Sequence, residues 1–163
     1  MLIRGIQETD WPAVWPFFDE VVADGQTYAF PPGLTSEAAR RLWVEPAPAA
    51  AWVAVEDGDG TVLGTARGGP NRPGPGSHVA TASFMVDPAA RGRGVGRALA
   101  EHVLTWARAQ GYLAVQFNAV VETNVAAVAL WQSLGFAIVG TVPEAFDHPD
   151  HGLVGLHVMH RRL

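Results

Sequence analysis

The sequence of 163 residues contains no cysteine and no lysine, so all 11 of its basic residues are arginine. Without cysteine there is no disulfide framework, cysteine-rich zinc site, thiolate nucleophile or acyl-cysteine intermediate. Without lysine, Schiff-base chemistry and a P-loop lysine are excluded. A protein of this composition that handles phosphate groups must use backbone N–H groups and arginine. One that handles acyl groups must use direct transfer or a non-thiol nucleophile.

Long apolar runs and a positive net charge are also absent. No stretch approaches the roughly 18 apolar residues of a spanning helix, and the first residues carry charge where a signal peptide has its apolar stretch. We therefore expect a cytoplasmic protein. The net charge of −5 argues against a sequence-independent nucleic-acid binder and against docking on an anionic membrane.

The order of apolar runs and turn signals predicts a single α/β domain over residues 1–163, with the element order β-α-α-β-β-β-α-β-α-β-β. The predicted strands span residues 2–6, 51–56, 61–67, 78–86, 113–121, 136–142 and 153–159. The predicted helices span residues 11–25, 35–43, 94–110 and 125–134. Pro16 is expected to kink the first helix or delay its regular part. Residues 57–60, D-G-D-G, predict a tight hairpin, and residues 68–76, rich in glycine and proline, predict a loop.

The most informative segment, residues 84–97, reads F-M-V-D-P-A-A-R-G-R-G-V-G-R. A strand ends there, and alternate glycines open directly into the clearest helix of the sequence. Glycine lets backbone N–H groups approach a ligand closely, and a helix N-terminus adds unpaired donors with partial positive charge. No acidic residue lies between Asp87 and Glu101. The segment therefore predicts an anion site formed by Arg91, Gly92, Arg93, Gly94, Val95, Gly96 and Arg97.

Three other interpretations of this loop compete with that one. A glycine-rich turn with incidental arginines is the plain structural alternative. A dinucleotide-binding fingerprint fails on spacing, because the third glycine position falls on Arg97 or Leu99. A Walker loop fails because the sequence has no lysine.

Two motifs together resemble the GNAT superfamily of N-acetyltransferases. Arg91-x-x-Gly94-x-Gly96 is similar to the family's acyl-CoA pyrophosphate loop, and residues 124–136, N-V-A-A-V-A-L-W-Q-S-L-G-F, are similar to its second helix on the CoA side. The resemblance implies a GNAT-like mixed sheet and an acetyl-CoA-dependent N-acetyltransferase acting on the amine of a small molecule. A narrower similarity, to enzymes acting on proline-like or other small amino acids, comes from Asn118 with Asn124 and from the T-Y and P-E-A-F segments.

The same resemblance implies a binding mode for acetyl-CoA and requires no metal. Its pyrophosphate would bind the N–H groups of residues 91–97, and its pantetheine arm would pass between Met85-Val86 and the strand from Leu113. Asn124 would hydrogen-bond that arm. The acceptor amine would attack the thioester directly, with the backbone N–H of Val86 as the oxyanion donor.

The general acid and base are open at this stage. Trp131 stands where the family often has an acidic tyrosine, and its indole cannot give up a proton, so it is either a core aromatic or a wall of the thioester pocket. Tyr28 is the better candidate for the acid. Asn118 is either a substrate contact or a satisfied buried amide. Thr81 and Ser83 are too weakly basic, which favours a water chain as the base.

Two further expectations complete the sequence-based interpretation. Residues 147–151, D-H-P-D-H, predict a solvated loop at the rim of the acceptor pocket in preference to a metal site, because Pro149 argues against the helix that would align His148 with His151. A CoA-binding sensor or pseudo-enzyme is the alternative to an enzyme, supported by Trp131. A homodimer is common among similar proteins, but no residue here predicts an interface.

Overall fold

The computed structural model describes all 163 residues, and its seven strands form one mixed sheet in the order β1-β2-β3-β4-β5-β7-β6. The strands are β1 (Leu2–Gly5), β2 (Ala50–Val55), β3 (Val62–Pro70), β4 (Val79–Val86), β5 (Ala114–Val121), β6 (Ala137–His148) and β7 (Gly152–Arg162). The helices are α1 (Trp11–Asp24), α2 (Ser36–Trp43), α3 (Val95–Ala109) and α4 (Val125–Ser133). The predicted fold class and element order are confirmed. No helix combines the length and apolarity needed to cross a membrane.

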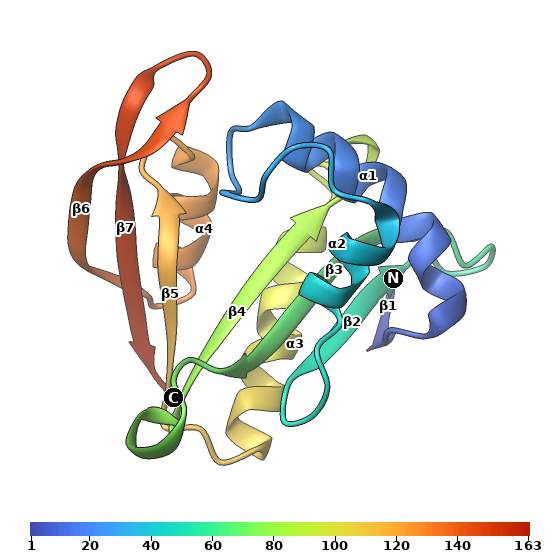
Figure 1. Ribbon diagram of the computed structural model, residues 1–163. Helices are drawn as coiled ribbons and strands as arrows, with labels where there is room; N and C mark the ends of the chain where they lie inside the picture. Colours follow the sequence, from blue (N-terminus) through green and yellow to red (C-terminus); the bar gives the residue numbers. More distant parts are fainter.

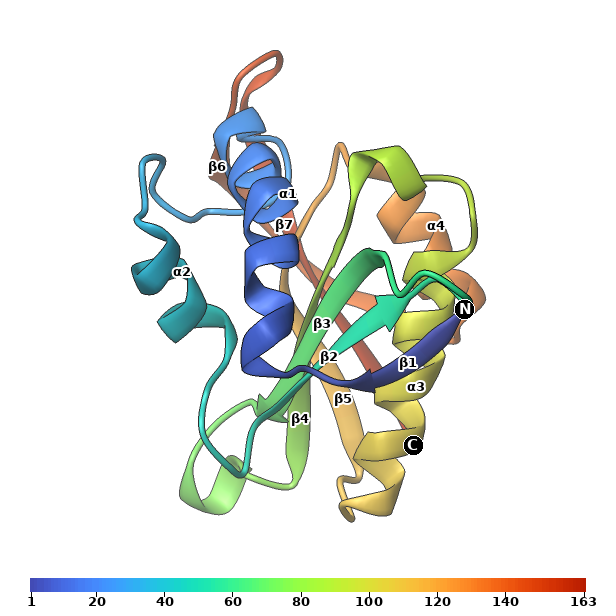
Figure 2. The same cartoon turned by 90° about the vertical axis from the view of Figure 1, so that its right-hand side faces the viewer.

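The two faces of the sheet are covered by different helices. α1 and α2 lie on one face and α3 and α4 on the other (Figure 2). On the first face, Phe18 and Trp43 pack against Met85 in one apolar cluster. On the second face, Leu99 and Leu104 belong to the clusters beneath α3. Because side chains alternate along a strand, each β4 residue faces one pair of helices or the other.

The neighbouring strands β4 and β5 are parallel and pair only briefly. Their register joins Val79 to Ala114 and Ala80 to Val115, and beyond these pairs the two strands diverge toward their carboxyl ends (Figure 1). β5 also shifts register against β7 between Phe117 and Val120. After Ala80, the β4 backbone groups that face β5 have no strand partner. Backbone N–H and C=O groups need a hydrogen-bond partner, so these must find one elsewhere.

The structure answers two expectations for the first half of the chain. α1 runs from Trp11 to Asp24 with Pro16 inside it, so Pro16 does not delay the start of the helix. The missing N–H costs a single bond near that start, while the apolar face of α1 is buried. β3 extends to Pro70 although residues 68–76 were expected to form a loop. Gly68 pairs with Ala82 there, and glycine suits the position, since an added Cβ would lie 3.0 Å from the Trp106 ring and would require that ring to shift.

The last two strands are longer than the sequence predicts. β6 reaches His148 and β7 extends to Arg162, whereas the expected strands were residues 136–142 and 153–159. A register shift between Val142 and Phe146, with Glu144 at a φ of 51°, absorbs the proline in this segment. The extension carries the end of β6 toward the loop that follows α1.

Candidate active site

A cavity of about 770 Å³ opens where β4 and β5 diverge. Its walls come from the α1–α2 loop, β3, β4, β5, the start of α4 and the end of β6. Of the predicted site residues, it is lined by Tyr28, Met85, Val86, Arg91, Asn118, Asn124 and Trp131. The rest of the predicted phosphate loop, Gly92, Arg93, Gly94, Val95, Gly96 and Arg97, does not line it. The structure therefore brings together residues that lie far apart in the sequence, with the phosphate loop continuing from Arg91.

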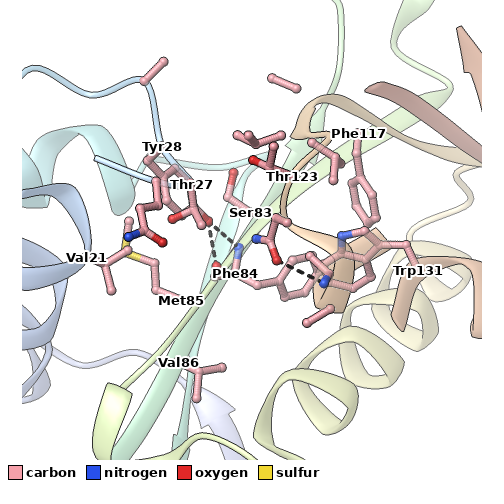
Figure 3. A pocket seen from close by; sticks show the side chains of 18 of the residues that line it. Val21, Thr27, Tyr28, Ser83, Phe84, Met85, Val86, Phe117, Thr123 and Trp131 are labelled. Carbon is pink, nitrogen blue, oxygen red and sulfur yellow. Dashed lines mark hydrogen bonds between the residues drawn. The ribbon is translucent and has the colours of Figure 1, made fainter. Parts of the chain in front are cut away.

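The hydroxyl of Tyr28 occupies the place where β5 would have paired with β4. It donates to the backbone carbonyl of Phe84 at 2.6 Å and accepts from the N–H of the same residue at 3.0 Å (Figure 3). Burial raises the pKa of Tyr28 well above its ordinary value, while the bond to Phe84 and the charge of Arg67 act in the opposite direction. The phenol is therefore neutral at physiological pH, and its proton is already engaged by the backbone.

The N–H of Val86 points to the same open side of β4. Successive residues of a strand direct their backbone groups to alternate sides, and the groups of Phe84 face Tyr28 across the gap. On the opposite side, the N–H of Asp87 donates to the carbonyl of Leu63 at 3.0 Å. Val86 thus has a donor directed into the cavity, as an oxyanion site requires.

The predicted phosphate loop has the backbone geometry that its glycines permit. Gly92 and Gly94 adopt φ values of 76° and 80°, a left-handed conformation that most side chains disfavour. No atom lies within 4 Å of a Cβ added at either position, so the loop is open to solvent. Gly94 is the N-cap of α3, which places the unpaired N–H groups of this helix at the loop.

The three arginines of the loop differ in their partners. Arg93 is paired with Glu56 of the β2–β3 hairpin. Arg97 donates to the hydroxyl of Ser133 at 2.8 Å and lies 3.7 Å from the carboxylate of Glu101. Arg91 has no side-chain partner and lines the cavity. Of the three, Arg91 is thus the cation available to an anionic ligand.

Two polar side chains stand at the opposite wall. The amide oxygen of Asn124 caps α4 by accepting the N–H of Ala127 at 3.1 Å, which leaves its NH₂ group free. The hydroxyl oxygen of Thr123 is buried and has no hydrogen-bond partner. A buried hydroxyl without a partner is costly, so a ligand that bonds to Thr123 would remove that cost. Sequence reasoning missed Thr123, and nothing in its local pattern marks it.

Trp131 is part of an aromatic cluster at the base of the cavity. Its ring centroid lies 5.0 Å from that of Phe84 and 4.8 Å from that of Phe117. The residue is 8% exposed and also lines the cavity, as Figure 3 shows. Trp131 is therefore a core aromatic, as one interpretation of the sequence had it, and it also lines the cavity. Its role as a wall of a thioester pocket stays a prediction.

Polar groups gather on the side of the cavity that faces α1 and α2. Arg67 pairs with Ser83 in the sheet register, which puts both side chains on that face. Asn118 is exposed, donates to Asn71 at 2.6 Å and accepts from Gln116 at 2.8 Å. The expectation of a buried amide for Asn118 was therefore wrong, although the amide does have partners.

His148 ends β6 and lines the cavity instead of lying in a solvated loop. Its side chain is enclosed, and the residue is 5% exposed. Its Nδ1 accepts the N–H of Asp150 at 3.1 Å, so the neutral ring carries its proton on Nε2 and acts there as a donor. No group of three or more histidine, aspartate or glutamate side chains is placed to hold a metal ion.

Comparison with known proteins gives consistent matches. The model of the Acetyltransferase (GNAT) family matches residues 10–136. A solved structure described as a GCN5-related N-acetyltransferase from Kribbella flavida is 62% identical, with a TM-score of 0.96 and coverage of 99% of this chain and 97% of that one. Another, described as ribosomal-protein-alanine N-acetyltransferase from Brucella melitensis, is 27% identical, with a TM-score of 0.81 and full coverage of both chains.

Curated relatives match over a shorter region. N-acetyltransferase aca1 of Schizosaccharomyces pombe is 36% identical over 100 residues, which are 61% of this chain and 47% of that protein. The chain thus spans less than half the length of this relative. The matched stretch of the family model includes both the phosphate loop and α4.

Proposed function

This chain belongs to the acetyltransferase (GNAT) family, and on that premise we propose that it transfers the acetyl group of acetyl-CoA directly to the amine of a small molecule, an amino acid or an analogue of one. The observation that carries the proposal is the cavity at the divergence of β4 and β5. It joins Arg91 and the phosphate loop to a donor at Val86 and then to a polar chamber beneath α1 and α2. Because the chain has no cysteine, no acyl-thiol intermediate on the protein enters the reaction.

In this proposal acetyl-CoA binds mainly through groups that have no other partner. The pyrophosphate accepts hydrogen bonds from the guanidinium of Arg91 and from N–H groups of residues 91–97, among which those of Arg91 and Arg93 already donate to Pro88 and Ala90 at 3.3 and 3.4 Å. The pantetheine arm lies along the open edge of β4, near the free NH₂ group of Asn124 and the unpaired hydroxyl of Thr123. The aromatic cluster around Trp131 keeps water from this part of the pocket.

The acceptor amine attacks the thioester carbonyl carbon, and the N–H of Val86 donates to the oxygen that becomes negative. The C–S bond then breaks, and CoA leaves as a thiolate that takes up a proton. The amine loses its proton to water, because the cavity offers no side chain suited to be the base: His148 presents a donor, and Ser83 and Thr81 are hydroxyls. Tyr28 contributes by holding Phe84, two residues before the oxyanion donor.

Two alternatives remain as outcomes of the test. A CoA-binding sensor without acyl transfer is favoured by Trp131 at the position of the family's tyrosine and by the lack of a side-chain base. An acceptor that is a protein N-terminus is favoured by the similarity to the ribosomal-protein-alanine N-acetyltransferase of Brucella melitensis, which aligns over the whole chain.

The experiment measures release of the CoA thiol from acetyl-CoA in the presence of amino acids, simple amines and a short peptide that begins with alanine. We expect the fastest release with a free amino acid. Faster release with the peptide would favour a protein acceptor. CoA binding by calorimetry without release by any amine would favour the sensor, and no CoA binding at all would contradict both the enzyme and the sensor.

A further inference from the structure

Arg67 is the one cationic side chain that lines the cavity on the face of α1 and α2, and it does not lie in the phosphate loop. It belongs to β3, opposite Ser83 of β4. Its side chain is 27% exposed. Besides the main cavity, it lines a second one of about 280 Å³, which shares Thr81, Ala82 and Asn118 with the first. Arg67 therefore stands where the two chambers meet.

The guanidinium of Arg67 is held in place by one of its nitrogens, and its other two nitrogens have no hydrogen-bond partner. Its Nη1 donates to the backbone carbonyl of Leu42 and to Glu45, and the group lies 5.9 Å from the ring centroid of Trp43. Nε and Nη2 have no partner. These two nitrogens form the edge that binds a carboxylate through two parallel hydrogen bonds. The structure thus presents a fixed and unoccupied donor edge.

From this edge we infer that the acceptor carries a carboxylate, which Arg67 binds while the amine is presented to the thioester. The inference rests on the proposed function and names the substrate class, amino acids and other amino-carboxylates. Ser83, opposite Arg67, is three residues from Val86, or about 10 Å at the usual rise of a strand. A free amino acid together with the Arg67 side chain spans that separation.

The electrostatics of this face suit an anionic group. Glu45 offsets part of the charge of Arg67, but its side chain is 49% exposed and therefore screened by water. Asp24 lines the main cavity and accepts from Gln26 at 3.4 Å. His148 lines the same cavity, and Asp24 is the only residue with a carboxylate among those that line it. The second cavity leaves room for the side chain of the amino acid.

The test compares three forms of one acceptor: the amino acid that reacts fastest, its amide and the amine without the carboxyl group. For the unmodified protein we expect kcat/KM for the acid to exceed that for the amide by about tenfold or more, as expected for loss of a charge-assisted hydrogen-bond pair. In Arg67→Met this preference disappears through a higher KM for the acid, while the KM for acetyl-CoA stays within about twofold. Arg67→Lys keeps the positive charge but cannot form two parallel hydrogen bonds to a carboxylate. It should therefore retain only part of the preference for the acid over the amide.

Arg72→Met is the matched control, because Arg72 is exposed and its side chain bonds only to the neighbouring carbonyl of Asn71. It should keep the full preference. Thermal unfolding of each variant shows whether the bond of Arg67 to Leu42 matters for folding. If Arg67→Met does not fold, the preference measured for Arg67→Lys tests the inference.

Two results would overturn the inference while leaving the proposed function intact: equal rates for acid and amide in the unmodified protein, or an equal loss for all three acceptors in the Arg67 variants. If no amine reacts at all, it is the proposed function that fails.

Discussion

The two sides of the gap between β4 and β5 are built in different ways. On the side of α3 and α4, the groups proposed to hold CoA are mostly backbone N–H groups and come from two continuous segments, residues 84–97 and 123–131. On the side of α1 and α2, the cavity is lined by side chains from separate elements, among them Tyr28, Arg67 and His148. A backbone site depends on local conformation, whereas a side-chain site depends on which elements meet.

The largest effect is expected from Val86→Pro, which removes the oxyanion donor at the boundary between the two sides. The substitution should lower kcat by about 100-fold or more and leave the Kd of acetyl-CoA nearly unchanged. Because the Val86 N–H faces away from β3, proline does not break the β3–β4 ladder. Steady-state rates and calorimetry measure the two quantities. Val86→Ala, which keeps the N–H, is the control, and an equal loss in that variant would rule out the backbone donor.

Gly94→Asp tests whether the backbone side binds the pyrophosphate. The carboxylate would face the phosphate oxygens at the N-terminus of α3, and we expect the Kd of acetyl-CoA to rise by about 50-fold, equivalent to roughly 2.3 kcal/mol. Gly94→Asn is the matched control, because asparagine tolerates the φ of 80° and adds no charge. Calorimetric titration gives both values. The same Kd in the two variants would show that no anion binds beside Gly94.

Arg91 and Arg93 differ in whether the guanidinium already has a side-chain partner, and substituting each one tests which of them binds acetyl-CoA. Arg91→Met should raise the Kd of acetyl-CoA by about tenfold, since it removes the one loop guanidinium without a side-chain partner. Arg93→Met should change it by no more than about twofold, because Glu56 already engages that group and exposed pairs contribute little. A larger effect at Arg93 would mean that the loop rearranges when CoA binds.

Tyr28→Phe tests a side chain from the acceptor side that acts on the backbone of β4. We expect the free energy of unfolding to fall by about 1–3 kcal/mol, because both partly buried backbone groups of Phe84 lose their partner, and kcat to fall by less than about tenfold. The raised pKa of Tyr28 means that its phenol stays protonated through the neutral range and above. Removing it should therefore leave the pH profile of kcat unchanged between about pH 6 and pH 9.

If Tyr28 instead acts as the general acid, as the sequence predicts, kcat falls by tenfold or more without loss of stability. Chemical denaturation and the pH profile together distinguish the two roles.

Sequence reasoning succeeded where the signal is local. The alternate glycines predicted the open turn that leads into α3, and the caps predicted most helix boundaries. Phosphate binding by that turn stays a prediction. Sequence reasoning failed where contacts between distant elements determine the position of a residue. His148 was expected in a solvated loop because the D-H-P-D-H segment has no strand pattern, yet pairing with β7 extends β6 to that residue. Arg67 carried no signal at all, since an arginine in a strand is usually a surface residue.

The sequence by itself determined the fold class, the order of elements, the position of the glycine-rich loop before α3 and the absence of thiol and lysine chemistry. These follow from composition, periodicity and glycine conformation, which act within a few residues. Only the tertiary structure decided that Tyr28 fills the gap in β4, that Arg67 keeps a free edge between two cavities and that Thr123 lacks a partner. These features depend on the divergence of two strands and on contacts between distant segments, such as Tyr28 with Phe84, 56 residues away, and Arg67 with Glu45, 22 residues away, and no local pattern encodes such contacts.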